Sequence, residues 1–348
     1  MEPEAEAVRQ PPSRKALRMR EQGAALIPSF QRPASRVAIR RAASYEEDLP
    51  ALLYETLREF QLPVRGKTVL LKPNLVGFDP LGVMNTHPAV ITAARESFLR
   101  LGAAQVLIGD GPAMDRDTEG ILESVRVGAY VGGLKSVFVD LNTDDVKRIP
   151  LKTRASRLRE LYLPKTALGV DFLVSMPKLK THHWAGVTLS LKNMFGIVPG
   201  GCYGWPKNVL HWAGIDRAIL DINAAARPDF AIVDGIVGME GNGPIQGTPK
   251  SSNVLILGDD PVAVDATCCR LMGLLPERVK YLSRACSFLG HVNSEMIQQL
   301  GEDIPSTGTS FAVLPAFRHL VDEHSVVWKQ SCSKEKIGMP PEEGSVSK

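Results

Sequence analysis

The residues best suited to chemistry gather in FLVSMPKLKTHHWAGVTLSLKNMFGIVPGG, residues 172–201. Its first five residues have the character of a buried strand, and Lys178, Lys180 and His182 then alternate along the chain. If this segment stays extended, the three side chains share one face, because successive side chains of a strand point to opposite faces. Two ammonium groups and an imidazole in one line would hold an anion and move a proton near neutral pH.

Lysines and amides also follow other apolar segments. Lys72 and Asn74 end KTVLLKPN, and Lys192 and Asn193 stand in LSLKN. A lysine at the inner end of an apolar strand loses water, which costs free energy unless an anion or a carboxylate compensates. One such lysine is more often a snorkelling edge residue, but a group of them favours a site. The predicted substrate-binding residues are Lys72, Asn74, Thr86, Lys178, Lys180, Thr181, Lys192 and Asn193.

The predicted catalytic groups are two histidines and two aspartates. His87 and His182 each follow a threonine beside the lysine segments, and imidazole is the usual acid–base group at neutral pH. Asp110 and Asp234 each end an apolar run and precede a glycine, so a turn role and a site role both stay open. In the site role they would fix the tautomer of an imidazole or bind a metal.

Cysteine and histidine spacing gives no metal motif. The five cysteines are odd in number and form no Cys-x-x-Cys, which argues against a disulfide framework, a zinc ribbon and an iron–sulfur cluster in this chain. No His-x-His or His-x-x-x-His occurs either, so we assign no metal ligands, although a divalent metal stays open. Cys268 and Cys269 fall in an apolar helical pattern, where we expect them to be buried and unreactive.

Charge and hydropathy exclude other classes. The formal net charge of +3 comes from 41 basic and 38 acidic residues, a balance that does not favour nucleic acid as a partner. No apolar run reaches the ~18 to 20 residues of a membrane span. The N-terminus MEPEAEAVRQPP lacks the apolar core of a secretion signal, so we expect a cytoplasmic protein.

The elements that would position these residues alternate between apolar strands and amphipathic helices. This pattern predicts an α/β fold with a mostly parallel, doubly wound sheet flanked by helices. Ligands of such sheets bind outside the carboxyl ends of the strands, where the polar residues above would converge. Asp259 and Asp260 also follow a strand, but the proline after them favours a helix cap. Predicted strands include 36–42, 67–74, 104–110, 171–178, 229–235 and 252–258, and predicted helices 44–60, 88–101, 215–226 and 261–274.

The strength of the strand and helix pattern along the sequence predicts the domain boundaries. We predict a flexible leader at 1–34, an α/β domain at 35–290, a C-terminal extension at 291–330 and a disordered tail at 331–348. The pattern weakens between Thr143 and Leu168, which leaves open one domain or two intertwined subdomains.

Several blocks resemble a known family in order. VLLKPNLV, NTHPAVITA, VLIGDGP, MPKLKTHHWAGVTLSLKNMFGIVPG, IVDGIVGMEGNGP and GDDPVAVDATCCRLMG are similar to successive blocks of the domain-of-unknown-function family 362. Members often carry a ferredoxin-like module with two four-iron clusters. This sequence lacks the cysteine run for one, so the resemblance implies a separate ferredoxin-like partner for any electron transfer. The layout is also distantly similar to the N-terminal region of nickel-dependent lactate racemases, from which no residue role transfers.

The combined prediction is an enzyme with a Lys/His-lined pocket for a small anionic substrate, either a carboxylate or a phosphate. Acid–base chemistry such as isomerisation fits these residues, and so does hydrolysis. The alternative is a non-catalytic or redox-accessory protein that acts with a separate iron–sulfur partner through the same surface.

Overall fold

A single large sheet organises the protein. The computed structural model describes residues 28–79, 81–113, 117–153 and 155–330. In these residues the sheet has the order β12-β1-β11-β10-β7-β2-β3-β4, and β8 extends it beside β10 with β9 at its edge. The strands are β1 (Ser35–Arg41), β2 (Thr68–Pro73), β3 (Gln105–Asp110), β4 (Phe138–Asp140), β7 (Phe172–Met176), β8 (Lys178–His182), β9 (Gly186–Thr188), β10 (Phe230–Glu240), β11 (Thr248–Gly258) and β12 (Ile297–Gly301). A separate hairpin joins β5 (Val146–Pro150) to β6 (Glu160–Pro164).

The predicted α/β class with a mostly parallel sheet is confirmed. Along the main order, every strand runs in one direction except β11, which is antiparallel to both β1 and β10. This reversal corrects one expectation, because the carboxyl end of β11 lies at the amino ends of its neighbours. Asp259 and Asp260 therefore sit at the edge opposite the other polar strand ends. Asp260 caps the next helix, as the proline after it predicted.

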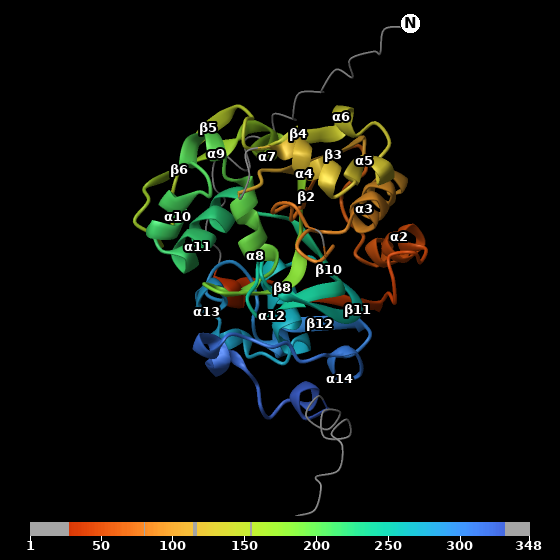
Figure 1. Cartoon of the computed structure of the whole chain (residues 1–348), viewed down its shortest axis with the longest axis vertical. Coiled ribbons are helices and arrows are strands. Elements are labelled where there is room, and N and C mark those ends of the chain that lie inside the picture. The colour runs from red at the N-terminus through yellow and green to blue at the C-terminus, as the bar shows by residue number, and fades with distance from the viewer. Residues whose placement is uncertain (1–27, 80, 114–116, 154, 331–348) are drawn as a thin grey trace, which may run out of the picture.

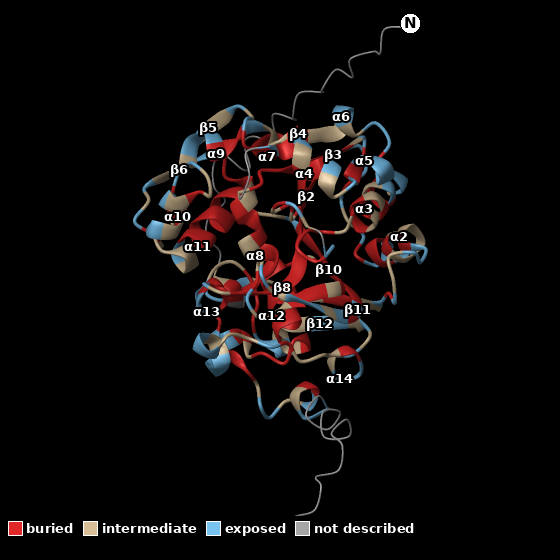
Figure 2. Ribbon diagram, in the orientation of Figure 1, coloured by how far each residue is buried: buried red, intermediate tan, exposed pale blue. Residues whose placement is uncertain are grey.

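Apolar side chains pack on both faces of the sheet, which is the reason for its doubly wound form. Leu70 points into the core on one face, whereas Val69 and Leu71 point into the core on the other. Figure 1 shows α10 and α11 on one side of the molecule and α2 and α3 on the opposite side. Buried residues follow the central strands in Figure 2, while exposed residues lie on the outward sides of the helices.

The helices begin where caps and prolines place them. The longer ones are α2 (Leu49–Glu59), α3 (Pro88–Arg100), α4 (Thr118–Ser124), α11 (Ile215–Ala226), α12 (Pro261–Leu271) and α13 (Lys280–Ala285). Helices of four or five residues are α5 (Val127–Tyr130), α6 (Leu134–Val137), α7 (Lys165–Gly169), α8 (Ser190–Asn193), α9 (Gly200–Tyr203), α10 (Asn208–Trp212) and α14 (Ile304–Thr307). Short 3₁₀ turns are η1 (Ser29–Gln31), η2 (Met194–Ile197), η3 (Pro276–Arg278), η4 (Ser294–Met296) and η5 (Pro315–Leu320). Helix α2 starts later than predicted, because the side chain of Asp48 accepts from Ala51 N–H and forms the cap there.

The ends of the described chain belong to the fold. Arg32, inside the predicted leader, donates to the carbonyl oxygens of Phe288 and Leu289, so the folded part begins before residue 35. The predicted extension supplies β12, which pairs in parallel with β1. Residues 1–27 and the predicted tail at 331–348 lie outside the described residues. No helix of the described chain is long and apolar enough to cross a membrane.

Thiol labelling tests the packing of α12. Cys268 and Cys269 are fully buried and burial raises both of their thiol pKa values well above the usual range, whereas Cys202 and Cys286 are exposed. Iodoacetamide should modify Cys202 and Cys286 in the native protein and leave the other two unmodified until denaturant is added. Peptide mass spectrometry measures this site by site. Modification of Cys268 as fast as Cys202 would contradict the packing described here.

Candidate functional site

The segment that carries the histidines changes partners at Pro177. Strand β7 lies between β2 and β10, and β8 continues beyond Pro177 beside the outer half of β10. Every residue of β8 is buried. The chain therefore stays extended past the end of the sheet's central part, which was the condition for Lys178, Lys180 and His182 to share one face, and carries its polar residues beyond the carboxyl edge.

A cavity of about 290 Å³ opens at this edge. Six predicted site residues line it, namely Asn74, Asp110, Lys180, His182, Lys192 and Asn193. Six others lie outside its lining, namely Lys72, Thr86, His87, Lys178, Thr181 and Asp234. The structure thus gathers half of the predicted residues around one cavity and leaves the other half outside its lining.

Lys178 and Asp234 form one supporting cluster. Lys178 Nζ lies 2.8 Å from Asp234 Oδ2 and 2.7 Å from Tyr45 Oη, and the Tyr45 hydroxyl donates to Asp234 Oδ1 at 3.0 Å. The ring of His87 stacks on Tyr45 with 3.8 Å between centroids, and its Nδ1 accepts from Ala89 N–H at the start of α3. Burial lowers the pKa of His87 to about 4. This histidine is therefore neutral and has its Nδ1 occupied at neutral pH.

Lys72 and Asp110 form a second buried pair. Lys72 Nζ lies 2.6 Å from Asp110 Oδ1 and also donates to Pro73 O and to Asn193 Oδ1. The Asn193 amide in turn donates to the carbonyl oxygen of Lys72 at 3.0 Å, so it ties α8 to β2. A Cβ atom at Gly196 would overlap both the Lys72 ammonium and the Asp110 carboxylate, which explains the need for glycine there. Because this pair is satisfied internally, its charge does not call for a ligand.

Three other lysines reach the cavity without a carboxylate partner. Lys180 Nζ donates to Met84 O at 2.6 Å and Lys207 Nζ to Gly111 O at 2.7 Å, and both lysines are almost completely buried. Lys192 is partly buried, and its Nζ lies 4.2 Å from the centre of the Phe195 ring. Within the described part of the chain, none of the three forms an ion pair, and Lys192 Nζ has no hydrogen-bond partner.

Burial changes the titration of these lysines. It lowers the pKa of Lys180, Lys192 and Lys207 to about 7 each, because a buried ammonium loses its hydration. Neighbouring lysines add to the effect, with Lys178 acting on Lys180 and Lys72 on Lys192. At neutral pH each amine is therefore shared between its charged and neutral forms.

Two neutral side chains at the cavity carry unsatisfied polar atoms. Thr188 Oγ1 and Asn74 Oδ1 are buried and have no hydrogen-bond partner among the residues described. Both residues line the cavity, and Thr188 lies directly across the β8–β9 pair from Lys180. Leaving a buried polar atom unpaired costs about 1–3 kcal/mol, so each atom is a ready partner for a bound molecule.

His182 keeps its outer nitrogen available as a donor. Its Nδ1 accepts the backbone N–H groups of Trp184 and Ala185, at 2.9 and 3.2 Å. A nitrogen that accepts carries no proton, so in the neutral ring the proton sits on Nε2. Burial, followed by the charge of Lys192, lowers the pKa of His182 well below its usual value. His182 is therefore a neutral hydrogen-bond donor.

His183 and His211 have the opposite tautomer. Their Nδ1 atoms lie 2.8 Å from Gly243 O and 3.1 Å from Lys207 O, and a carbonyl oxygen can only accept. Nδ1 of each ring therefore carries a proton. Burial lowers the pKa of His211 to about 4, so this ring is neutral and its Nε2 has a free lone pair.

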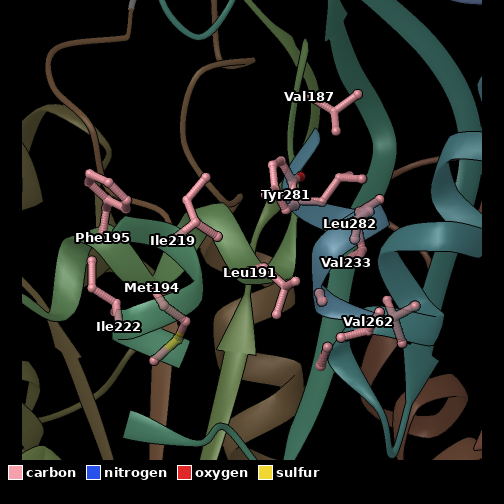
Figure 3. Close-up of a cluster of buried hydrophobic side chains, with 14 of the residues drawn as sticks. Val187, Leu191, Met194, Phe195, Ile219, Ile222, Val233, Val262, Tyr281 and Leu282 are labelled. Atoms are coloured by element: carbon pink, nitrogen blue, oxygen red, sulfur yellow. The ribbon is translucent and has the colours of Figure 1, made fainter. Parts of the chain in front are cut away.

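A buried aspartate holds the helix that carries Lys192. The carboxylate of Asp265 on α12 accepts the backbone N–H groups of Ser190 and Leu191, at 2.7 and 3.0 Å. Burial raises the pKa of Asp265 to about 7. Leu191 and Met194 of this segment belong to the same buried apolar cluster as Ile219, Ile222 and Val262, all labelled in Figure 3.

Two comparisons with known proteins decide the family. The family described as "Domain of unknown function (DUF362)" matches residues 69–270. The thylakoid-associated protein sll1697 of Synechocystis sp. is 30% identical over 259 residues, which make up 70% of this chain and 76% of that relative. The chain belongs to the DUF362 family.

Solved structures give weaker likenesses to this DUF362 protein. The lactate racemase apoprotein from Thermoanaerobacterium thermosaccharolyticum has 16% identity and a TM-score of 0.42 over 71% of this chain and 58% of its own. A protein from Thermotoga maritima has 15% identity and a TM-score of 0.37 over 66% of this chain and 59% of its own. The chain thus spans less than two thirds of either structure, and neither assigns a role to its residues.

Six polar or aromatic residues that line the DUF362 cavity were not predicted from the sequence. These are His183, Trp184, Thr188, Phe195, Lys207 and His211. Lys207 and His211 are four positions apart, a spacing that puts two residues on one side of a helix and could have drawn attention to them. Thr188 gave no signal, since its position follows from the pairing of β8 with β9. No group of three or more metal-ligating side chains occurs in the described ranges.

Removing one partner of a buried ion pair tests whether Lys72 has a structural role, unlike the cavity lysines that have no carboxylate partner. Lys72→Met should lower the free energy of unfolding by about 3–5 kcal/mol, because it leaves Asp110 buried without its cation. The double variant Lys72→Met/Asp110→Asn should recover a large part of this loss. Urea unfolding measures both, with exposed Lys135→Met expected to stay within about 0.5 kcal/mol of the wild type. A loss no larger for Lys72→Met than for Lys135→Met would show that the pair is not structural.

Proposed function

We propose that this protein is an enzyme that binds a small anionic substrate in the cavity and moves a proton on it. The observation that carries the proposal is the convergence of Lys180, Lys192 and Lys207 on one cavity without a paired carboxylate among the described residues. Lys72 and Lys178 show that this chain places carboxylates beside buried lysines where it needs only stability. The three lysines of the cavity are better explained by a charge that arrives with a ligand.

An anion would repay the cost of burying these lysines. An unpaired buried ammonium is unfavourable because its lost hydration has no replacement. A carboxylate or phosphate in the cavity supplies the missing charge, and its oxygen atoms accept from the ammonium groups. Phosphate and carboxylate both fit this description, and both are retained in the proposal.

The three lysines have different freedom to act. The carbonyl oxygens of Met84 and Gly111 fix Lys180 and Lys207, so these two ammonium groups hold the anion in one place. His182 adds a neutral N–H donor from Nε2, which suits an oxygen atom that gains negative charge during reaction. These three residues form the binding half of the proposed site.

Lys192 is the proposed proton-transfer group. Its amine has no hydrogen-bond partner among the described residues, and its pKa of about 7 lets it exist in both forms at neutral pH. The neutral amine takes a proton from the carbon next to a substrate carboxylate, and the C–H electron pair moves into that carboxylate. The resulting ammonium then returns the proton to a different carbon of the delocalised anion, so that the double bond moves and an isomer of the substrate forms. Isomerisation of a small carboxylate is therefore the reaction class that we favour.

The cellular location stays a prediction. The sequence favours the cytoplasm, whereas the name of the Synechocystis relative associates that protein with thylakoids. Binding of an anion by the cavity does not depend on either location.

An anion screen tests the binding half of this proposal. Sulfate, phosphate and acetate should each raise the melting temperature of the wild type if they bind the folded state. At an anion concentration of ten times Kd, the free energy of unfolding should rise by roughly 1.4 kcal/mol. Lys180→Met and Lys192→Met should lose this protection without loss of stability in the absence of anion, because each removes an unpaired charge. If the anions raise the melting temperatures of both variants as much as that of the exposed control Lys135→Met, the cavity is not the binding site.

A further inference from the structure

Aromatic rings form one continuous wall of the cavity. Ring centroids are 5.0 Å apart for His182 and His183, 4.8 Å for His183 and Trp184, and 5.2 Å for Trp184 and His211. Phe195 continues the row at 5.5 Å from His211. All five residues line the cavity that the lysines share. The wall is therefore assembled from two segments that are separate in sequence, the β8–β9 turn and the region of η2 and α10.

Two histidine rings of this wall are neutral, and hydrogen bonds hold its turn in place. The rings of His182 and His211 are neutral at pH 7, because burial lowers their pKa values. The backbone N–H of His183 donates to Gly243 O at 2.8 Å, and that of Trp184 donates to His182 Nδ1. The turn that presents Trp184 is thus fixed before any ligand binds, which lowers the entropic cost of binding.

Trp184 has more exposed surface than its role in folding requires. Its side chain is 58% exposed at the turn between β8 and β9, although it lines the cavity. Its edge-to-face contacts with His183 and His211 leave much of the ring uncovered. A large aromatic residue in such a place is available to a ligand at little cost to the core.

The lysines lie next to this wall. Lys192 Nζ is 4.2 Å from the centre of the Phe195 ring, so an anion held by Lys192 would have the aromatic row beside it. The cavity volume of about 290 Å³ is at the small end of ligand pockets, which span about 300–1,000 Å³. We propose that the substrate carries a planar aromatic or conjugated ring beside its anionic group, with the ring against Trp184 and His211. This inference rests on the proposed function and narrows its substrate class.

Planarity separates this proposal from simple apolar binding. A saturated ring of the same size buries similar or greater apolar area, so the hydrophobic effect alone does not favour the flat ring. Stacked or edge-to-face contacts between aromatic rings add about 0.5–1.5 kcal/mol, which corresponds to roughly 2- to 12-fold in Kd. Tighter binding of the aromatic ring than of the saturated ring therefore indicates contact with the aromatic wall.

The test compares benzoate, cyclohexanecarboxylate and acetate by isothermal titration calorimetry at pH 6.5. We expect the wild type to bind benzoate about 2- to 12-fold more tightly than cyclohexanecarboxylate. The preference should fall to about one in Trp184→Ala and persist in Trp184→Phe, which keeps an aromatic ring. Trp212→Ala is the matched control, since Trp212 is 78% exposed, lies on the same helix as His211 and does not line the cavity.

The outcomes separate this inference from the proposed function. If acetate and benzoate bind the wild type with equal affinity, the anion site stands and the aromatic substrate class is wrong. If the benzoate preference is unchanged in Trp184→Ala, or is lost equally in Trp212→Ala, the wall does not hold the ring. If none of the three carboxylates binds, and sulfate and phosphate do not bind either, the proposed function itself fails.

Discussion

A buried ammonium group needs a compensating charge, and this requirement shapes the site of the protein. Lys72 and Lys178 meet it with Asp110 and Asp234. Lys180, Lys192 and Lys207 have no carboxylate partner in the described chain, and burial lowers each pKa to about 7 instead of the usual 10.5. Because these folded-state pKa values are depressed, the lysines oppose folding most strongly below pH 7. Their destabilising effect fades as pH rises from about 7 towards 10.5. At neutral pH and below, a bound anion would offset this cost by supplying the missing negative charge.

The architecture brings these charges together through ordinary packing. Parallel strands place Lys72 and Asp110 at one edge of the sheet. Strand β8 follows β7, pairs with the outer half of β10 and carries Lys180 and His182 beyond that edge. Asp265 fixes the start of α8 and so the position of Lys192. The paired lysines are part of this support, since Lys72 binds Asn193 on the same helix. The pair of Lys72 and Asp110 thus helps to position the helix that carries the unpaired Lys192.

The sequence predicted the fold class and much of the cavity because both follow from local pattern. Apolar runs with polar ends indicated a parallel sheet, and the alternation in β8 predicted that Lys180 and His182 lie together. The same alternation placed Lys178 with them, but Asp234 on the neighbouring strand draws its ammonium into a separate cluster. No single strand contains the information for such a pairing.

Other features depended on contacts between distant segments. Strand β11 forms a long hairpin with β10, and its reversed direction puts Asp259 at the opposite edge of the sheet. The apolar pattern of a strand does not indicate its direction, so the sequence did not predict this reversal. Lys207 enters the cavity from the region between α9 and α10, where the sequence has no strong periodic pattern. Its Nζ donates to the carbonyl oxygen of Gly111, which is 96 residues away in sequence, so no local pattern indicated this contact.

Proton uptake on anion binding would show that the lysines of the cavity hold the anion. Binding should raise the pKa values of Lys180 and Lys207, the two lysines that hold the anion, from about 7 towards 10.5. The protein should therefore take up protons from solution at pH 8 and none at pH 5.5, where both amines are already protonated. Calorimetric titration with sulfate, in two buffers of different ionisation enthalpy, measures this uptake, and sulfate itself does not titrate in this range. We predict net proton uptake at pH 8 and weaker sulfate affinity there than at pH 6. Sulfate binding at pH 8 with no proton uptake would contradict this prediction.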